Sequence, residues 1–533
     1  MSKITQQERN GLFELTPDAK AELEKSTYYN PDLAPTTVEQ RNWSTASICN
    51  LWVGMSICIP SLTLASSLVA LGVSPLLAVL NVILGNLIVL IPIQLNSKIG
   101  TKYGIPFPIF SRMTFGNKGT HLPTFSRSIV ACGWTSIQAW VGGGAVAALL
   151  GILIPMFSDQ SNTVAMPGND SVVVGQLIGF AIFMVFVFFV AYHGLDQVKW
   201  VQNIGGPVLI VIMILLMFFS INMLHESGYT IGQAFAQGND EALIAQNGGF
   251  AFVYMAGLTA NIAFWATMAL NIPDFSRYAK SVKSQFNGQM LGMPIPMALC
   301  AFVGALFAQA TRLNPAIGVA QFDPSAVFYY VDNKLLVAIC AIGVIMATIT
   351  TCVAANVVAP ANGFSNIAPT KISYKKGVII TVIIAVVVMQ PWFIYGSGAA
   401  YIFTWLNNYG TIIAPVAAIL IADFFFVKKE LVDVAGLYRG EGGRYWYSNG
   451  WNWNAMIAWV ASFIIPLLGN TVFAYNAANG GSPNFLQYLA ANGYIVSFVI
   501  AMVVYVALMN NTKGRANFGY VTKEEHDSFT VKG

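Results

Sequence analysis

About a dozen apolar runs, each close to twenty residues long, divide this chain of 533 residues. A helix of that length crosses a hydrocarbon core of about 30 Å. The runs are interrupted irregularly by glycine and proline and lack the ten-residue alternation of an outer-membrane barrel. Because 56% of the residues are apolar and only 9% are charged, we expect an all-α polytopic membrane protein.

The apolar runs predict about twelve transmembrane helices. They are expected at 44–71, 75–95, 125–154, 174–192, 205–223, 250–272, 290–310, 335–359, 377–393, 401–426, 454–469 and 486–509. The corresponding divisions are an amino-terminal cytosolic tail (1–43), helices one to five (44–223), an extracytoplasmic loop (224–249), helices six to ten (250–426), a cytosolic loop (427–453), helices eleven and twelve (454–509) and a carboxy-terminal cytosolic tail (510–533).

Positive charge gathers in every second loop. The basic loops carry Lys98, Lys102, Arg112 and Lys118; Arg277, Lys280 and Lys283; Lys371, Lys375 and Lys376; and Lys428, Lys429, Arg439 and Arg444. By the positive-inside rule, we expect both termini to lie in the cytosol. The expected location is the plasma (inner) membrane. Residues 1–41 have no apolar signal-peptide core, and we expect a disordered lead there rather than a gate latch.

Composition also limits the partners. The net charge of +4 requires no nucleic-acid partner, and no sequence feature indicates an obligate protein partner. All six cysteines fall within predicted spans, without metal-type spacing, and are interpreted as small packing residues.

Two predicted spans carry helix breakers at matching places. Span one contains Gly54 and Pro60, and span six contains Gly257 and ends at Pro273. Each is the first span of a group of five, which favours two inverted repeats with a substrate held at the breaks. The alternative is ordinary kinking, because glycine and proline are common in membrane helices.

The polar residues inside the spans indicate the ligand. No acidic or basic residue lies near the middle of a predicted span; Asp274, Arg277 and Asp423 lie at span ends. Trp134 and Gln138 share one helix face and could hold a flat, neutral ring by stacking and hydrogen bonds. The alternative is that Trp134 belongs to an aromatic belt and Gln138 bonds a neighbouring helix.

Thr350 and Thr351 are adjacent hydroxyls in an otherwise apolar stretch of span eight. Hydroxyl oxygens, together with carbonyls freed by a broken helix, suit a small, hard cation. The alternative is that each threonine bonds the carbonyl one turn earlier in its own helix.

Six motifs in order along the chain resemble the nucleobase-cation-symport-1 family. They are NPDLAPTTVEQRNWS (30–44), GTKYGIPFPIFSRMTFG (100–116), WTSIQAWVGG (134–143), NIPDFSRYAK (271–280), AANVVAP (354–360) and IADFFFVKKE (421–430) followed by LYRGEGGRYWY (437–447). The resemblance implies a secondary transporter for uracil, allantoin, hydantoins, cytosine or a related compound. It also implies the leucine-transporter fold of five plus five inverted repeats, with two extra helices.

The resemblance to sodium-coupled bacterial hydantoin permeases of this family implies roles for ten residues. Trp134 and Trp265 would sandwich the substrate ring, Gln138 and Asn356 would hydrogen-bond it, and Leu406 would gate it. Sodium would be held by carbonyls of Gly54, Ile57 and Ala347 and by hydroxyls of Thr350 and Thr351. Cys58 departs from the glutamine of those permeases, which weakens the assignment to hydantoins.

The expected function is import of a neutral nucleobase-like heterocycle, uracil or allantoin first, across the lipid bilayer with a coupling cation. Sodium is preferred as that cation, and a proton-coupled permease for hydantoin or cytosine is the alternative. A membrane sensor that binds the same ligands without transport is a different class. An enzyme is not expected, because no span pairs serine with histidine or aspartate and the four histidines lack HExxH spacing.

Overall fold

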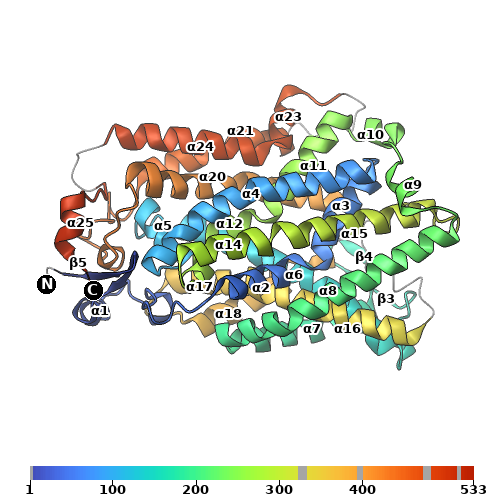
Figure 1. Cartoon of the computed structure of the whole chain (residues 1–533), viewed down its shortest axis with the longest axis horizontal. Helices are drawn as coiled ribbons and strands as arrows, with labels where there is room; N and C mark the ends of the chain where they lie inside the picture. Colours follow the sequence, from blue (N-terminus) through green and yellow to red (C-terminus); the bar gives the residue numbers. More distant parts are fainter. Residues whose placement is uncertain (1–3, 322–332, 393–399, 472–481, 513–517, 533) are drawn as a thin grey trace.

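The computed structural model describes residues 4–321, 333–392, 400–471, 482–512 and 518–532. Figure 1 shows the long helices side by side along the longest axis of the molecule, with both chain ends at the same end. We call this the terminal end, and the opposite end the distal end.

Each predicted span coincides with a helix or a broken helix. In order they are α2 (Thr45–Ser56) with α3 (Ile59–Ala70), α4 (Pro75–Tyr103), α6 (His121–Gly151), α7 (Val174–Tyr192), α8 (Leu195–Glu226), α11 (Phe250–Phe264) with α12 (Ala266–Asn271), α14 (Val282–Gly292) with α15 (Pro294–Leu313), α16 (Lys334–Thr351) with the π-helix η4 (Cys352–Val357) and α17 (Val358–Ile367), α18 (Tyr374–Ile383) with η5 (Ile384–Val388), α20 (Ala400–Ile421) with η6 (Ala422–Val427), α21 (Trp453–Thr471) and α24 (Gly493–Asn510).

By length and apolarity, eight helices of the described residues can cross a membrane, or nine with the bent pair α2 and α3. The all-α membrane fold is therefore confirmed. Two predicted spans are too short: span two continues to Tyr103 rather than ending near 95, and span seven starts at Val282 rather than near 290. These extensions carry polar residues beyond the apolar run that defined each prediction.

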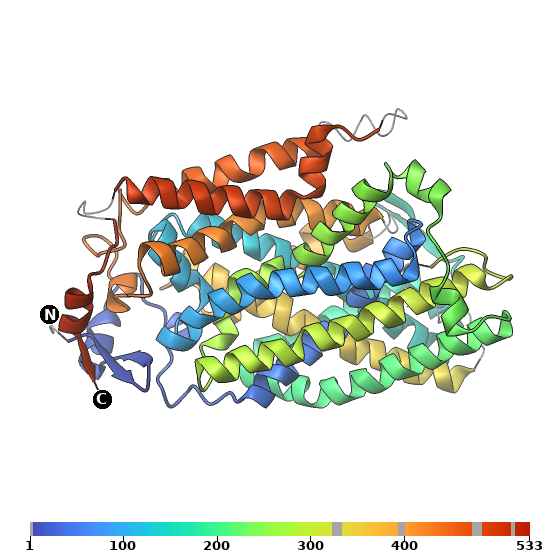
Figure 2. The same ribbon diagram turned by 45° about the horizontal axis from the view of Figure 1, so that its top comes forward.

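Short elements connect the spans. They are α5 (Phe107–Phe115), η2 (Pro155–Phe157), β3 (Thr163–Met166), β4 (Asn169–Val173), α9 (Ile231–Phe235), α10 (Glu241–Gln246), α13 (Pro273–Ser276), η7 (Ala435–Tyr438) and α23 (Phe485–Ala491). Figures 1 and 2 both show α21 and α24 at one edge of the bundle, packed against α20.

Span one is broken between its two helices. Ile57 and Cys58 have extended backbones, and α2 and α3 meet at 52°. Pro60 lies in the first turn of α3, where its missing N–H breaks no helical hydrogen bond. The backbone of the break is therefore outside the helical ladder and can serve a ligand.

Span six is also broken, but not at Gly257. That glycine lies inside α11, because a membrane helix accommodates a small residue without interruption. The break is at Trp265, and Pro273 begins the separate short helix α13. The expected pair of broken spans is present, although the predicted break at Gly257 is wrong.

The amino-terminal tail is folded, and the expectation of a disordered lead is wrong. Strands β1 (Gln6–Arg9), β2 (Leu12–Leu15) and β5 (Thr530–Lys532) form a sheet in the order β2-β1-β5, which joins the two ends of the chain. Three short helices, α1 (Pro17–Leu23), η1 (Pro31–Leu33) and α25 (Lys523–Phe529), accompany it. Phe13 is buried and stacks on Tyr103 at 4.8 Å between ring centroids. Apolar side chains within the polar tail drive this docking.

Candidate substrate and cation sites

A small cavity lies where the break of span six meets α6 and the π-helix of span eight. Its lining comprises Trp134, Gln138, Phe264, Trp265, Thr267, Met268, Thr351, Ala355 and Asn356. Four of the five predicted substrate residues therefore converge. The cavity volume is about 20 Å³, which is room for about one water molecule, so a heterocycle requires these side chains to move apart.

The polar groups of the cavity are mostly paired with one another. The Asn356 amide donates to Gln138 Oε1 at 3.1 Å, and both side chains are buried. Trp134 Nε1 donates to the Tyr409 hydroxyl at 3.1 Å, which in turn donates to the Ala263 carbonyl at 2.8 Å. Trp265 Nε1 is buried without a hydrogen-bond partner among the described residues. The cavity thus holds the unpaired indole N–H of Trp265 and two amides that can exchange partners.

The two indoles are not arranged as an open slot. Phe264 meets the Trp134 ring edge-on, with centroids 5.4 Å apart, and the Trp265 ring edge-on at 5.0 Å. A ring stacked between the indoles therefore has to displace Phe264. The sequence analysis did not identify Phe264, although it is adjacent to Trp265.

The predicted gate residue Leu406 is fully buried in α20 but does not line the cavity. Tyr409, about one turn further along α20, supplies this helix's hydrogen bonds to α6 and α11. A role for Leu406 as a gate stays a prediction.

The predicted cation ligands gather beside the break of span one. Thr350 Oγ1 lies 3.1 Å from the Gly54 carbonyl oxygen and 2.7 Å from that of Ala347. Thr351 Oγ1 lies 3.1 Å from each of the same two carbonyl oxygens. The threonines therefore bond their own helix, as the alternative expects, and also reach across to α2. Ile57 lies at the break itself, with an extended backbone.

These residues fit a hard cation. The donors are all oxygens, and the broken helix supplies carbonyls that are free of the helical ladder. Each hydroxyl can turn its proton away from the carbonyls and offer a lone pair. Because Thr351 also lines the substrate cavity, the two candidate sites share a side chain.

Arg127 lies beneath the cavity and was missed by the sequence analysis. The residue is 1% exposed. It donates to Asn271 Oδ1 at 2.8 Å, to the Thr267 carbonyl at 3.1 Å and to the Ala355 carbonyl at 2.9 Å. The signal was present: Arg127 is seven residues before Trp134 and therefore lies on the same helix face. A buried charge within an apolar span indicates function by default.

The family model for permeases for cytosine/purines, uracil, thiamine and allantoin matches residues 35–509 of this chain. The purine-uracil permease NCS1 of Arabidopsis thaliana is 34% identical over 90% of this chain and 78% of its own length. The allantoin permease of Bacillus subtilis is 29% identical over 90% of this chain and 93% of its own.

Solved structures share the fold. Mhp1, a nucleobase-cation-symport-1 family transporter in a closed conformation with bromovinylhydantoin bound, has a TM-score of 0.75 at 19% identity and covers 94% of this chain and 99% of its own. A Na+-coupled sialic acid symporter has a TM-score of 0.57 at 12% identity and covers 92% and 95%. The chain therefore belongs to the nucleobase-cation-symport-1 family of permeases and is a membrane transporter, not an enzyme.

Proposed function

We propose that this permease imports a neutral nucleobase-like heterocycle, uracil or allantoin, in symport with sodium by alternating access. The membrane is the plasma membrane, and the terminal end faces the cytosol. Support comes from the purine-uracil and allantoin permeases among its relatives and from a cavity lined by amides and indoles without a charged side chain.

The observation that carries the proposal is the double position of Thr351. Its hydroxyl lies within 3.1 Å of the Gly54 carbonyl, in the candidate cation site, and its side chain lines the candidate substrate cavity. Coupling requires that cation and substrate stabilise the same conformations. A cation bound at the break fixes Thr351 and so shapes the wall against which the substrate binds.

In the substrate-binding step, the Gln138 and Asn356 amides exchange their mutual hydrogen bond for bonds to the ring. Trp265 Nε1 supplies a further donor, and Phe264 leaves the space between the indoles. α20 then covers the substrate, and α2 to α4 with α11 to α15 rock against α6, α7 and α16 to α18 to release substrate and cation inward.

The test is uptake by purified protein in liposomes. Labelled uracil and allantoin are offered with an inward sodium gradient or with choline. Accumulation above the external concentration, dependent on sodium, supports a symporter, whereas saturable binding without accumulation supports the sensor. No saturable response to either compound excludes both proposed substrates.

Thr351→Ala tests the cation site, with Thr348→Ala as a matched control. Thr348 is a buried threonine of the same helix whose hydroxyl bonds only the Val344 carbonyl among the interactions described. We expect Thr351→Ala to reduce sodium stimulation of uptake at least tenfold and Thr348→Ala to leave it unchanged. Equal stimulation in the two variants would contradict the site.

Proton coupling is the second candidate, and Asp274 favours it. This carboxyl lies in α13, outside the spans, and accepts from the Phe107 backbone N–H at 2.9 Å. Burial raises its pKa to about 6, against the opposing effect of Arg277. It therefore changes charge near neutral pH. If a pH gradient drives uptake when choline replaces sodium, and Asp274→Asn abolishes that uptake, the coupling ion is the proton rather than sodium.

A further inference from the structure

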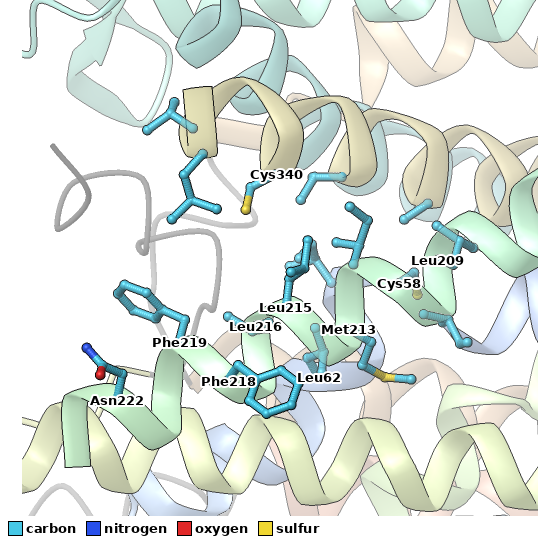
Figure 3. A pocket seen from close by; sticks show the side chains of 17 residues that line it. Cys58, Leu62, Leu209, Met213, Leu215, Leu216, Phe218, Phe219, Asn222 and Cys340 are labelled. Atoms are coloured by element: carbon cyan, nitrogen blue, oxygen red, sulfur yellow. The ribbon is translucent and has the colours of Figure 1, made fainter. Parts of the chain in front are cut away.

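A second cavity, of about 340 Å³, lies between the start of α3, the distal half of α8 and the distal two-thirds of α16. Figure 3 shows side chains from these helices directed into it. Among its 17 described lining residues only Asn222 carries an amide, and none carries a charge. The side chains of the wall are otherwise aliphatic, aromatic, methionine and cysteine, so they offer no partners for the polar groups of the proposed substrate.

The cavity reaches the membrane-facing surface of the bundle. Phe218 lines the cavity and is 59% exposed, and Asn222 is exposed as well. The flanking surface of α8 is apolar, with Val211 55% exposed and Ile214 38% exposed. Only 28% of the span Val208–Glu226 is buried inside the protein, the smallest share among the described spans. The cavity is therefore continuous with a surface that faces hydrocarbon.

This surface contacts the lipid bilayer, so the molecules available to fill the cavity are lipids. A methylene group takes up about as much space as a water molecule, about 30 Å³, so the cavity has room for about ten methylenes. An empty apolar cavity of this size forfeits the dispersion contacts of its walls. An acyl chain of the surrounding bilayer restores them without exposing a polar group.

The two ends of the cavity differ in polarity, as the headgroup and the acyl chain of a phospholipid do. Asn222 is at one end, four residues before the end of α8, and its amide donates to the exposed Glu226 carboxylate at 2.8 Å. Ile57, Cys58 and Ala347 are at the other end, beside the break of span one. A chain whose headgroup rests near Asn222 points its methyl end toward the break.

We propose that this cavity binds one acyl chain of a bilayer phospholipid. The chain fills the space between α8 and α16 and packs against Ile57 and Ala347, two of the candidate cation ligands. While it is bound, the cavity has no room for water beside these ligands.

The test is native mass spectrometry of the full-length protein purified from membranes in mild detergent. Leu216→Trp fills the cavity, since Leu216 lines it, and Val211→Trp places the same indole on the exposed side of α8. We expect one retained phospholipid on the wild-type chain and on Val211→Trp, and at least a tenfold lower retained fraction on Leu216→Trp. Absence of retained phospholipid on the wild-type chain, or equal retention on all three proteins, would overturn the proposal.

A second measurement needs no core substitution, in case Leu216→Trp does not fold. Cys340 lines the cavity and is half-buried, so its alkylation by N-ethylmaleimide reports access. In the wild-type protein we expect delipidation to accelerate alkylation several-fold and added phosphatidylethanolamine to slow it again. An alkylation rate that ignores both treatments would count against an acyl chain here.

Discussion

The two halves of the broken span six are fastened to the rest of the protein by different chemistry. On the α12 side, the buried Arg127 guanidinium donates to the Asn271 side chain and to the carbonyls of Thr267 and Ala355. On the α11 side, a neutral chain runs from Trp134 through Tyr409 to the Ala263 carbonyl. We call these the α12 cover and the α11 cover of the substrate cavity.

The difference indicates which side opens more readily. Hydrogen bonds to a charged group contribute about 1.5–3 kcal/mol, whereas neutral ones contribute about 0.5–1.5 kcal/mol. The α12 cover leads to the terminal end through α13. Just after α13, the Trp43 backbone N–H donates to the Tyr278 carbonyl at 2.9 Å. We therefore expect the ligand-free protein to stay closed on the terminal side and to admit substrate past the α11 cover.

Removal of Arg127 has the largest expected effect. Arg127→Met keeps the apolar stem and removes the four described hydrogen bonds of the guanidinium, so we expect α12 to be released. The measurement is labelling of Ala355→Cys, in a chain without native cysteines, by a membrane-impermeant thiol reagent added at the terminal end. We expect the rate to rise at least tenfold, which corresponds to about 1.4 kcal/mol.

Arg127→Lys is the control for this prediction. It keeps the charge but loses the planar fork that bonds several acceptors at once, so we expect an intermediate rate. A rate in Arg127→Met equal to that of the parent would show that the guanidinium does not hold this side closed. A melting temperature measured on each variant separates opening from unfolding.

Loss of the Tyr409 hydroxyl has a smaller expected effect. Tyr409→Phe removes two neutral hydrogen bonds and keeps the ring that meets Trp134 edge-on. We expect labelling of Ala355→Cys from the distal side to rise about threefold, with no change from the terminal side. Faster labelling from the terminal side would contradict the proposal that the two covers open independently.

Asp274, in α13 next to the α12 cover, gives the smallest expected effect. Its pKa in the folded protein, about 6, is above the ordinary value of 3.8 because the carboxyl is buried. The folded protein therefore binds this proton more tightly than the unfolded chain, and this contribution is complete below about pH 4 and lost as the pH rises through 6. We expect the melting temperature to fall by about 2 °C more between pH 5 and 7 in the wild type than in Asp274→Asn. Parallel curves for the two proteins would contradict the shifted pKa.

The contrast between the covers was only partly predictable. Trp134 and Gln138 were identified because an indole and an amide share one helix face in an apolar span, and the family resemblance added Trp265 and Asn356. Arg127 was overlooked because it lies six residues inside α6, close to the predicted span end at 125. Two of its hydrogen-bond partners, Asn271 and Ala355, are 144 and 228 residues away along the chain, so the sequence does not show that they meet Arg127.

The helix breaks, too, were only partly predictable from the sequence. The break of span one follows from local backbone chemistry, since Pro60 favours the first turn of a new helix. The break at Trp265 and the π-helix Cys352–Val357 carry no such local signal. Both are stabilised by contacts between helices, which restore the hydrogen bonds and packing that an irregular helix loses.

The sequence by itself determined that the chain is a helical membrane protein, which spans it has and to which family it belongs. These properties follow from apolar run length, loop charge and ordered motifs, all of which are local. Only the tertiary structure decided that the terminal tails form a sheet, that Thr351 lies at both candidate sites and that Arg127 bonds the Thr267 and Ala355 carbonyls at the cavity. Each of these depends on residues far apart in the chain, whose distances are fixed only when the helices pack.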